Sequence, residues 1–291
     1  MNMSIWYFAS GRSFWAGVGL MGAAAILYLL LSGRILRRLC VIVFFMGTLL
    51  VYLSVTPLPQ IVSMWVWLLI IAWGVAACIV PLSQAFRLSL VWGTLGFVAV
   101  AAAFEYRLAR IPAILQREWK TIYVIGDSVS SGIGGPTETA WPVRLGQRLG
   151  RSVSNLAVAG ATAGSAVQRQ LPQVTQANSL VFLEIGGNDL LNGNEPEAYA
   201  TSLRVLLGEL RRQNQTMVMF ELPRLIWHRP YGRIQRRLAQ EYGVILIPRT
   251  FLADIFSGPN LTSDSIHLTQ RGHDVFAKNV YDLLDGSNDG H

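Results

Sequence analysis

Long stretches without charge dominate the first third of the chain, and shorter apolar runs alternate with mixed segments after it. Four stretches contain no Asp, Glu, Lys or Arg and are 20, 18, 20 and 17 residues long: Ser13–Ser32, Leu39–Thr56, Ile61–Val80 and Leu88–Phe104. A helix needs about 20 apolar residues, within a range of about 17–25, to cross a bilayer. We therefore predict a transmembrane region over residues 1–106, with spans at about 13–32, 39–56, 61–80 and 88–104.

Two other interpretations of these stretches are weaker. A buried soluble core would not require four consecutive uncharged runs of this length. A cleaved signal peptide is disfavoured because its candidate small-residue site, Ala23 to Ala25, lies inside the first apolar run and three more runs follow.

The pattern changes after Lys120. Apolar runs of about five residues alternate with helical patterns, which is typical of a buried parallel sheet. Strands are expected at 121–125, 153–158, 180–185, 216–221 and 244–247, and helices at 141–149, 165–171, 197–213, 233–242 and 269–284. We predict an α/β domain over residues 121–285, with five parallel strands in a three-layer, flavodoxin-like arrangement, and a tail over 286–291.

Charge and cysteine usage exclude several classes of function. Residues 1–110 carry seven Arg and one Glu, whereas the remaining residues carry 17 Lys and Arg against 16 Asp and Glu. The basic charge therefore belongs to loops that flank membrane spans, and nucleic acid is not expected as a partner. Cys40 and Cys78 both fall in predicted spans, so neither a disulfide framework nor a Cys-x-x-Cys metal site is expected. No cofactor or metal is expected.

Candidate chemistry sits where predicted strands end. Ser128 follows the run Tyr123-Val124-Ile125-Gly126-Asp127, where open α/β sheets bind ligands. A serine hydroxyl is a poor nucleophile at neutral pH and needs a neighbouring base. Three further motifs supply candidate partners: Gly160 after a second strand, Asn188 after a third, and Asp264-Ser265-Ile266-His267 near the C-terminus.

The order of these four motifs resembles the SGNH branch of the GDSL hydrolases, over roughly residues 120–285. The pair Trp141-Pro142 after the serine motif is similar to the bacterial thioesterase, lysophospholipase and arylesterase group. The resemblance implies the strand order 2-1-3-4-5.

The resemblance also implies a role for each motif. Ser128 would attack an ester or thioester carbonyl, His267 would act as base and then acid, and Asp264 would orient His267. The backbone N–H groups of Ser128 and Gly160 and the side-chain amide of Asn188 would form the oxyanion hole.

Other polar residues have simpler interpretations. His273 is a rival base but lacks the Asp-x-x-His context, so a surface or packing role is favoured. Asp127 and Asp189 suit capping of a helix or turn, and Glu184 a structural role at a strand end. His228 falls in the segment 224–232, which could cover the site, and His291 is terminal.

The chain departs from the family pattern at two motifs. Ala161 follows Gly160, where relatives commonly carry an acidic residue, and Ser265 and Leu268 stand where Gly and Pro are frequent. These differences leave the chemistry intact and leave the substrate open. We expect a membrane-anchored serine esterase acting on a lysophospholipid, acyl thioester or short acyl ester. The alternatives are an O-acyl esterase or transferase acting on cell-envelope polysaccharide, and an inactive membrane scaffold. Protein partners are unknown.

The arginines beside the spans indicate an orientation. Arg34, Arg37 and Arg38 flank the first span on one side and Arg12 on the other, which places the hydrolase domain outside the cytoplasm. The full count opposes this weakly, with four Lys and Arg on the first side and five on the second. We predict a bacterial inner-membrane protein with a periplasmic hydrolase domain, joined to the membrane region by a linker at 107–120.

Overall fold

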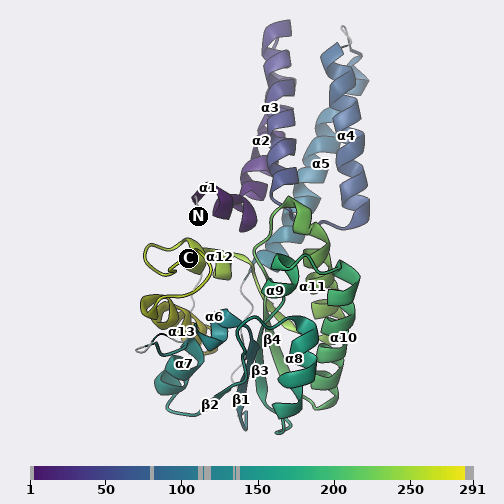
Figure 1. Cartoon of the computed structure of the whole chain (residues 1–291). Helices are drawn as coiled ribbons and strands as arrows, with labels where there is room; N and C mark the ends of the chain where they lie inside the picture. Colours follow the sequence, from purple (N-terminus) through teal and green to yellow (C-terminus); the bar gives the residue numbers. More distant parts are fainter. Residues whose placement is uncertain are drawn as a thin grey trace. The chain divides into compact units, whose positions relative to one another are not determined.

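The chain forms two compact units, each described here by itself. The computed structural model describes residues 3–78, 82–110, 114, 119–133, 135 and 138–285. One unit contains the β-sheet with its surrounding helices, and the other contains four long helices together with the short segment Arg224–Arg229 (Figure 1). Half of the predicted linker, residues 111–113 and 115–118, lies outside the described residues.

The four long helices are apolar enough to cross a membrane. They are α2 (Arg12–Leu30), α3 (Arg34–Leu53), α4 (Gln60–Cys78) and α5 (Gln84–Ala109). The prediction of four such helices is confirmed. The fourth was expected to be the shortest, yet α5 is the longest at 26 residues. Its terminal turns contain Arg87 and Arg107, so a search for uncharged residues underestimates its length. A short helix, α1 (Met3–Ala9), precedes them and was not predicted.

Close packing joins α2 to α3 through two glycines. A Cβ on Gly17 would lie 2.7 Å from the carbonyl oxygen of Gly47, and one on Gly47 would lie 2.7 Å from that of Gly17. Small residues allow helix backbones to approach closely, as is common between membrane helices. Elsewhere in this unit, Trp73 stacks on Phe44 at 4.6 Å between ring centroids and donates a 3.0 Å hydrogen bond to Thr94 Oγ1.

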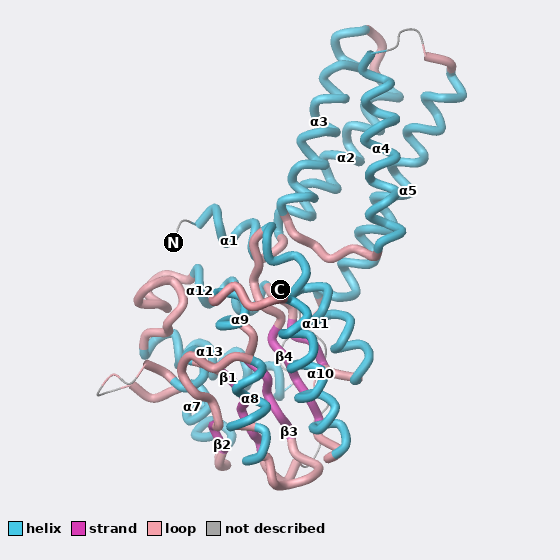
Figure 2. Tube along the Cα trace, turned by 45° about the vertical axis from the view of Figure 1, so that its right-hand side comes forward, coloured by secondary structure: helices cyan, strands magenta, loops and turns pink. Residues whose placement is uncertain are grey.

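The sheet of the other unit has five parallel strands. They are β1 (Ile122–Gly126), β2 (Val153–Asn155), β3 (Leu180–Glu184), β4 (Thr216–Phe220) and β5 (Ile245–Ile247). Their order is β2-β1-β3-β4-β5, which confirms the expected order and the α/β fold (Figure 2). The adjacent central strands β1 and β3 are buried along their whole length.

Alternate residues of the strands face two separate cores. In β1, β3 and β4, odd-numbered positions such as Tyr123 and Ile125 pack with α8 (Ala163–Arg169), α10 (Pro196–Arg212) and α11 (Arg229–Tyr242). Even-numbered positions of these strands, such as Val124 and Phe182, pack with α7 (Trp141–Leu149), α12 (Thr250–Ser257) and α13 (Gln270–Asp285). Figure 1 shows these two helical layers on opposite faces of the sheet. The alternation follows from the two-residue period of a strand.

Several short elements were not predicted. They include α6 (Ser128–Ser131), α9 (Gly187–Leu191), α12 and the 3₁₀ turns Leu171–Gln173 and Ile226–His228. Segments of three to eight residues show too few turns for a helical period to be read. Helix α8 ends at Arg169, two residues before the predicted end, and the 3₁₀ turn Leu171–Gln173 follows it. Pro172 lies in this turn and cannot continue an α-helix.

The contact between α2 and α3 can be tested with paired glycine variants. Gly17→Leu should destabilise the four-helix unit, because its side chain would enter space held by the α3 backbone. Gly19→Leu is the matched control, since a Cβ on Gly19 meets nothing within 4 Å. Thermal unfolding of the full chain in a neutral detergent should show a lower midpoint temperature for Gly17→Leu alone. The expected loss of stability is roughly 1–3 kcal/mol, the usual cost of overpacking. Equal midpoints for the two variants would contradict the packing.

Candidate active site

Ser128 lies at the carboxyl end of β1, a central strand of the sheet. It is the first residue of α6 and is partly exposed, while Asp127 before it caps that helix by accepting a 3.0 Å hydrogen bond from the Val129 N–H. The turn is tight, since a Cβ on Gly126 would lie 2.8 Å from Ser130 Cβ. Ligands of open α/β sheets bind at this end, beside the point where the strand order reverses.

Two neighbouring loops are joined to this turn. The chain after β2 stays alongside β1 through a 3.2 Å bond from the Val158 N–H to the Gly126 carbonyl. Gly160 follows with φ +77°, a conformation that suits glycine. From α9, Asn188 Nδ2 donates to Asp127 Oδ2 and to the Ala161 carbonyl, both at 3.1 Å. The structure thus connects the serine, glycine and asparagine motifs through Asp127 and Asn188.

The hydrogen bonds of Asn188 also define its orientation. Both partners of Nδ2 are acceptors, so a flipped amide would place Oδ1 against two oxygens. Both of its N–H groups are engaged in this state. To donate to an oxyanion, the amide must therefore share or release one of these bonds.

A short hydrogen bond joins the side chains of Asp264 and His267. Asp264 Oδ2 lies 2.6 Å from His267 Nδ1, while Oδ1 accepts the backbone N–H groups of Ile266 and His267 at 3.1 and 2.9 Å. The bond from the His267 ring, followed by these backbone bonds, lowers the pKa of Asp264 to about 2. An ionised carboxylate at this distance fixes the ring tautomer with Nε2 available.

The turn between these two residues explains one departure from the family pattern. Ser265 has φ +83°, in the left-handed region that glycine adopts without strain. A serine there keeps the turn geometry at some conformational cost. The position therefore requires a left-handed backbone conformation, which glycine adopts with the least strain.

The structure does not join Ser128 to His267 by a hydrogen bond among the residues it describes. Burial raises the pKa of Asp127 to about 6, against the lowering effects of the Val129 N–H, Glu184, the His267 charge and Asn188. Catalytic hydrogen bonds are often long before substrate binds.

Glu184 contributes more to this region than its sequence context indicated. It pairs in register with Gly126, and burial together with the Asp127 charge raises its pKa well above the ordinary value. Ser130 Oγ donates to Glu184 Oε2 at 3.0 Å, and Trp141 Nε1 donates to Ser130 Oγ at 3.1 Å. Two carboxyl groups buried side by side favour retention of a proton. The signal in the sequence was an acid at the end of an otherwise apolar buried strand.

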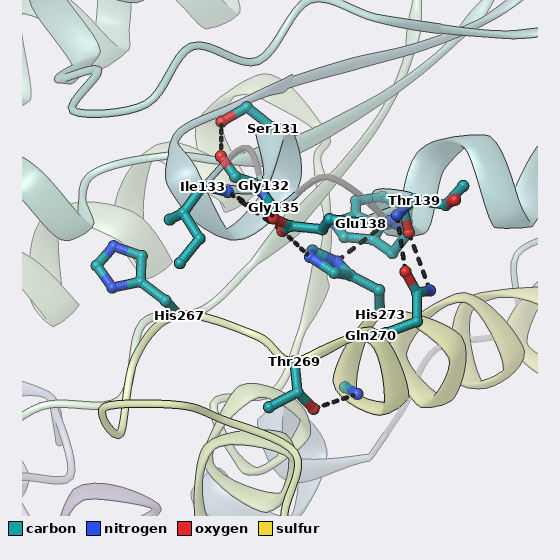
Figure 3. Close-up of polar contacts among 12 residues, drawn as sticks. Ser131, Gly132, Ile133, Gly135, Glu138, Thr139, His267, Thr269, Gln270 and His273 are labelled. Carbon is teal, nitrogen blue, oxygen red and sulfur yellow. Dashed lines mark hydrogen bonds and ion pairs between the residues drawn. The ribbon is translucent and has the colours of Figure 1, made fainter.

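The rival base His273 is engaged elsewhere (Figure 3). It is fully buried, and its Nδ1 accepts a 3.3 Å hydrogen bond from the backbone N–H of Trp141. Its Nε2 lies 2.8 Å from Glu138 Oε1. Glu138 also accepts the N–H groups of Ile133 and Gly135. Burial lowers the pKa of His273, which keeps the ring neutral and suits this arrangement. The group attaches the loop after α6 to α13, so the packing interpretation of His273 agrees with the structure.

The remaining candidates have separate locations. Asp189 accepts the Ala163 N–H at 2.8 Å and so caps α8. His228 lies in the 3₁₀ turn Ile226–His228, inside the segment that clusters with the long helices, so the expected cover over the site is not established. His291 lies outside the described residues. Within the described part of the chain, no group of three or more His, Cys, Asp and Glu side chains could hold a metal ion.

Comparison with known proteins gives consistent similarities. Residues 124–275 match the GDSL-like Lipase/Acylhydrolase family. The thioesterase 1/protease 1/lysophospholipase L1 of Escherichia coli K12 is 29% identical over 157 residues, covering 50% of this chain and 74% of the relative. The esterase TesA of Pseudomonas aeruginosa is 25% identical over 193 residues, covering 61% and 94%. A crystal structure of the psychrotrophic esterase EstA from Pseudoalteromonas superimposes with a TM-score of 0.51 at 22% identity, covering 58% and 99%.

The buried acid pair makes a prediction about pH and stability. The native state holds protons on Asp127 and Glu184 above pH 4, where the unfolded chain has released them, so stability should fall as pH rises from about 4 to above 6. For Asp127 alone the rise from 3.8 to about 6 corresponds to roughly 3 kcal/mol. Glu184→Gln should flatten this fall in chemical unfolding of the full chain, because an amide donates to Asp127 without titrating.

Glu209→Gln is the control, since this exposed glutamate pairs only with Arg212 among the described residues. It should leave the slope of stability against pH unchanged. Equal slopes for wild type and Glu184→Gln would contradict the retention of protons by this buried acid pair.

Proposed function

This chain belongs to the GDSL-like Lipase/Acylhydrolase family, and on that premise we propose that it is a membrane-anchored serine esterase using Ser128, His267 and Asp264. The 2.6 Å contact between Asp264 and His267 is the observation that carries the proposal. A carboxylate so placed holds His267 with Nε2 free to accept a proton. The position of Ser128 at the carboxyl end of β1 supports its role as nucleophile.

The reaction would proceed through an acyl-enzyme. His267 would take the Ser128 proton as the oxygen attacks the ester carbonyl, and would then deliver that proton to the leaving group. The backbone N–H groups of Ser128 and Gly160 and the amide of Asn188 would donate to the oxyanion. Water, activated by the same imidazole, would release the acid and restore the serine.

Exposed apolar side chains in the site loops favour an acyl lipid as substrate. Ile133, Val158 and Leu191 follow or precede the proposed site residues by only a few positions and are exposed by 56%, 40% and 62%. Such side chains gain free energy when an acyl chain covers them. The E. coli relative, a thioesterase and lysophospholipase, points to the same substrate class.

The four apolar helices support anchoring in a bilayer. Large apolar side chains such as Leu30, Ile61 and Trp92 are exposed by 72%, 79% and 67% on their outer faces. Lipid would cover these surfaces. The arginines that flank the first span favour a periplasmic hydrolase domain, as argued above.

The nucleophile is tested with the full chain purified in a neutral detergent. Ser128→Ala should lower kcat for p-nitrophenyl esters by at least about 10³-fold, since the attacking oxygen is removed. Ser131→Ala is the matched control, because this serine lies in the same helix and its hydroxyl contacts only the Gly132 carbonyl among described residues. Activity retained in Ser128→Ala would overturn the proposal.

The substrate class is tested by measuring hydrolysis of p-nitrophenyl esters with acyl chains from acetyl to palmitoyl. The esters with longer chains should be hydrolysed faster. A sharp preference for acetyl would favour the alternative, an O-acyl esterase or transferase acting on cell-envelope polysaccharide.

The base is tested by comparing two histidines. His267→Ala and Asp264→Asn should each lower kcat by about 10²–10⁴-fold, because the proton acceptor or its orientation is lost. His273→Gln should keep kcat within about tenfold while lowering thermal stability, since it breaks the buried contact with Glu138. Loss of activity in His273→Gln with retention in His267→Ala would reverse the assignment.

A further inference from the structure

A small basic cavity lies within the four-helix unit. Its lining residues come from the end of this unit where α2 joins α3 and α4 is followed by α5, and Figure 1 shows this end of the helices. Its volume is about 180 Å³. At about 30 Å³ per molecule in the liquid, this is room for about six waters. Among the residues that line it are four arginines and a tyrosine: Arg34, Arg37, Arg38, Arg87 and Tyr28. The cavity is thus large enough for a small anionic group.

Among the described residues, no carboxylate lines this cavity. Glu105 is the only acidic residue in the first 110 positions. It lies on the same helix as Arg87 but 18 residues away, which is about 27 Å at the helical rise. Arg37 and Arg87 are partly buried, whereas Arg34 and Arg38 are exposed. Since like charges repel, four arginines around one cavity favour the binding of an anion from elsewhere.

Two of these arginines present buried donors. The Nε atoms of Arg37 and Arg87 are inaccessible to solvent and have no hydrogen-bond partner among the residues described. The Arg37 guanidinium also lies 6.0 Å from the centre of the Tyr28 ring, a contact that restricts its position. A buried donor without an acceptor costs free energy, and an anion bound here would recover it.

We propose that this cavity binds a phosphate group, supplied by the headgroup of an anionic phospholipid. Guanidinium groups form paired hydrogen bonds with phosphate oxygens, and several guanidiniums can share one phosphate. Helices of 19 and 20 residues span about the thickness of the hydrocarbon layer, so their ends meet the headgroups. Basic pockets between membrane helices suit such headgroups. The inference uses the proposed membrane placement and is independent of the esterase chemistry.

The test measures lipid binding by the full chain. The thermal midpoint is followed in neutral detergent during titration with phosphatidylglycerol, inorganic phosphate, or oleate as a phosphate-free anion. Arg37→Gln/Arg87→Gln removes two charges at the cavity. Arg107→Gln/Arg110→Gln removes two charges outside the cavity, near the last turn of α5, and is the matched control. Unliganded midpoints and ester hydrolysis report whether each variant folds.

Phosphatidylglycerol should raise the wild-type midpoint with saturation. The cavity variant should bind at least tenfold more weakly and the control variant within about threefold of wild type. Equal effects of phosphatidylglycerol and free phosphate would keep the phosphate site but reject the lipid source. Equal weakening in both variants, or equal stabilisation by oleate, would overturn the proposal. Loss of esterase activity in Ser128→Ala leaves these outcomes unaffected, so the two proposals fail separately.

Discussion

The candidate active site depends on one buried carboxyl group, that of Asp127. It caps α6 through the Val129 N–H, and it accepts a hydrogen bond from Asn188, which follows the neighbouring strand. Glu184 lies against it from β3. Without this acceptor, the turn that carries Ser128 and the loop that carries Asn188 would lose their direct connection. The geometry of the nucleophile and of one proposed oxyanion donor is therefore coupled through a single side chain.

Burial gives this carboxyl group its unusual chemistry. Water would stabilise both charges of an exposed acid pair. The protein interior at the carboxyl ends of β1 and β3 does not, so the pKa values of Asp127 and Glu184 rise. Asp264 experiences the opposite effect, because it is exposed and surrounded by donors from its own turn. The acids at this end of the sheet thus have different tasks, one joining loops and the other orienting an imidazole.

Two units with different physical requirements meet in this chain. In the sheet unit, apolar residues pack against both faces of the sheet. In the four-helix unit, small residues and aromatic contacts form the interior, whereas large apolar side chains lie outside. Charge is confined to the ends of those helices. This confinement brings Arg37 and Arg87 to one cavity.

Periodicity and length determined most of the fold. Uncharged runs near 20 residues identified four long helices, and short apolar runs between helical patterns identified five parallel strands, because burial imposes both patterns locally. Motif order alone grouped Ser128, Gly160, Asn188, Asp264 and His267 as candidates. Only tertiary structure revealed the burial of Glu184 beside Asp127, the contact of His273 with Glu138 and the arginine cavity. These depend on contacts between residues up to 135 positions apart, such as His273 with Glu138. Local sequence does not encode which distant side chain will satisfy a buried charge.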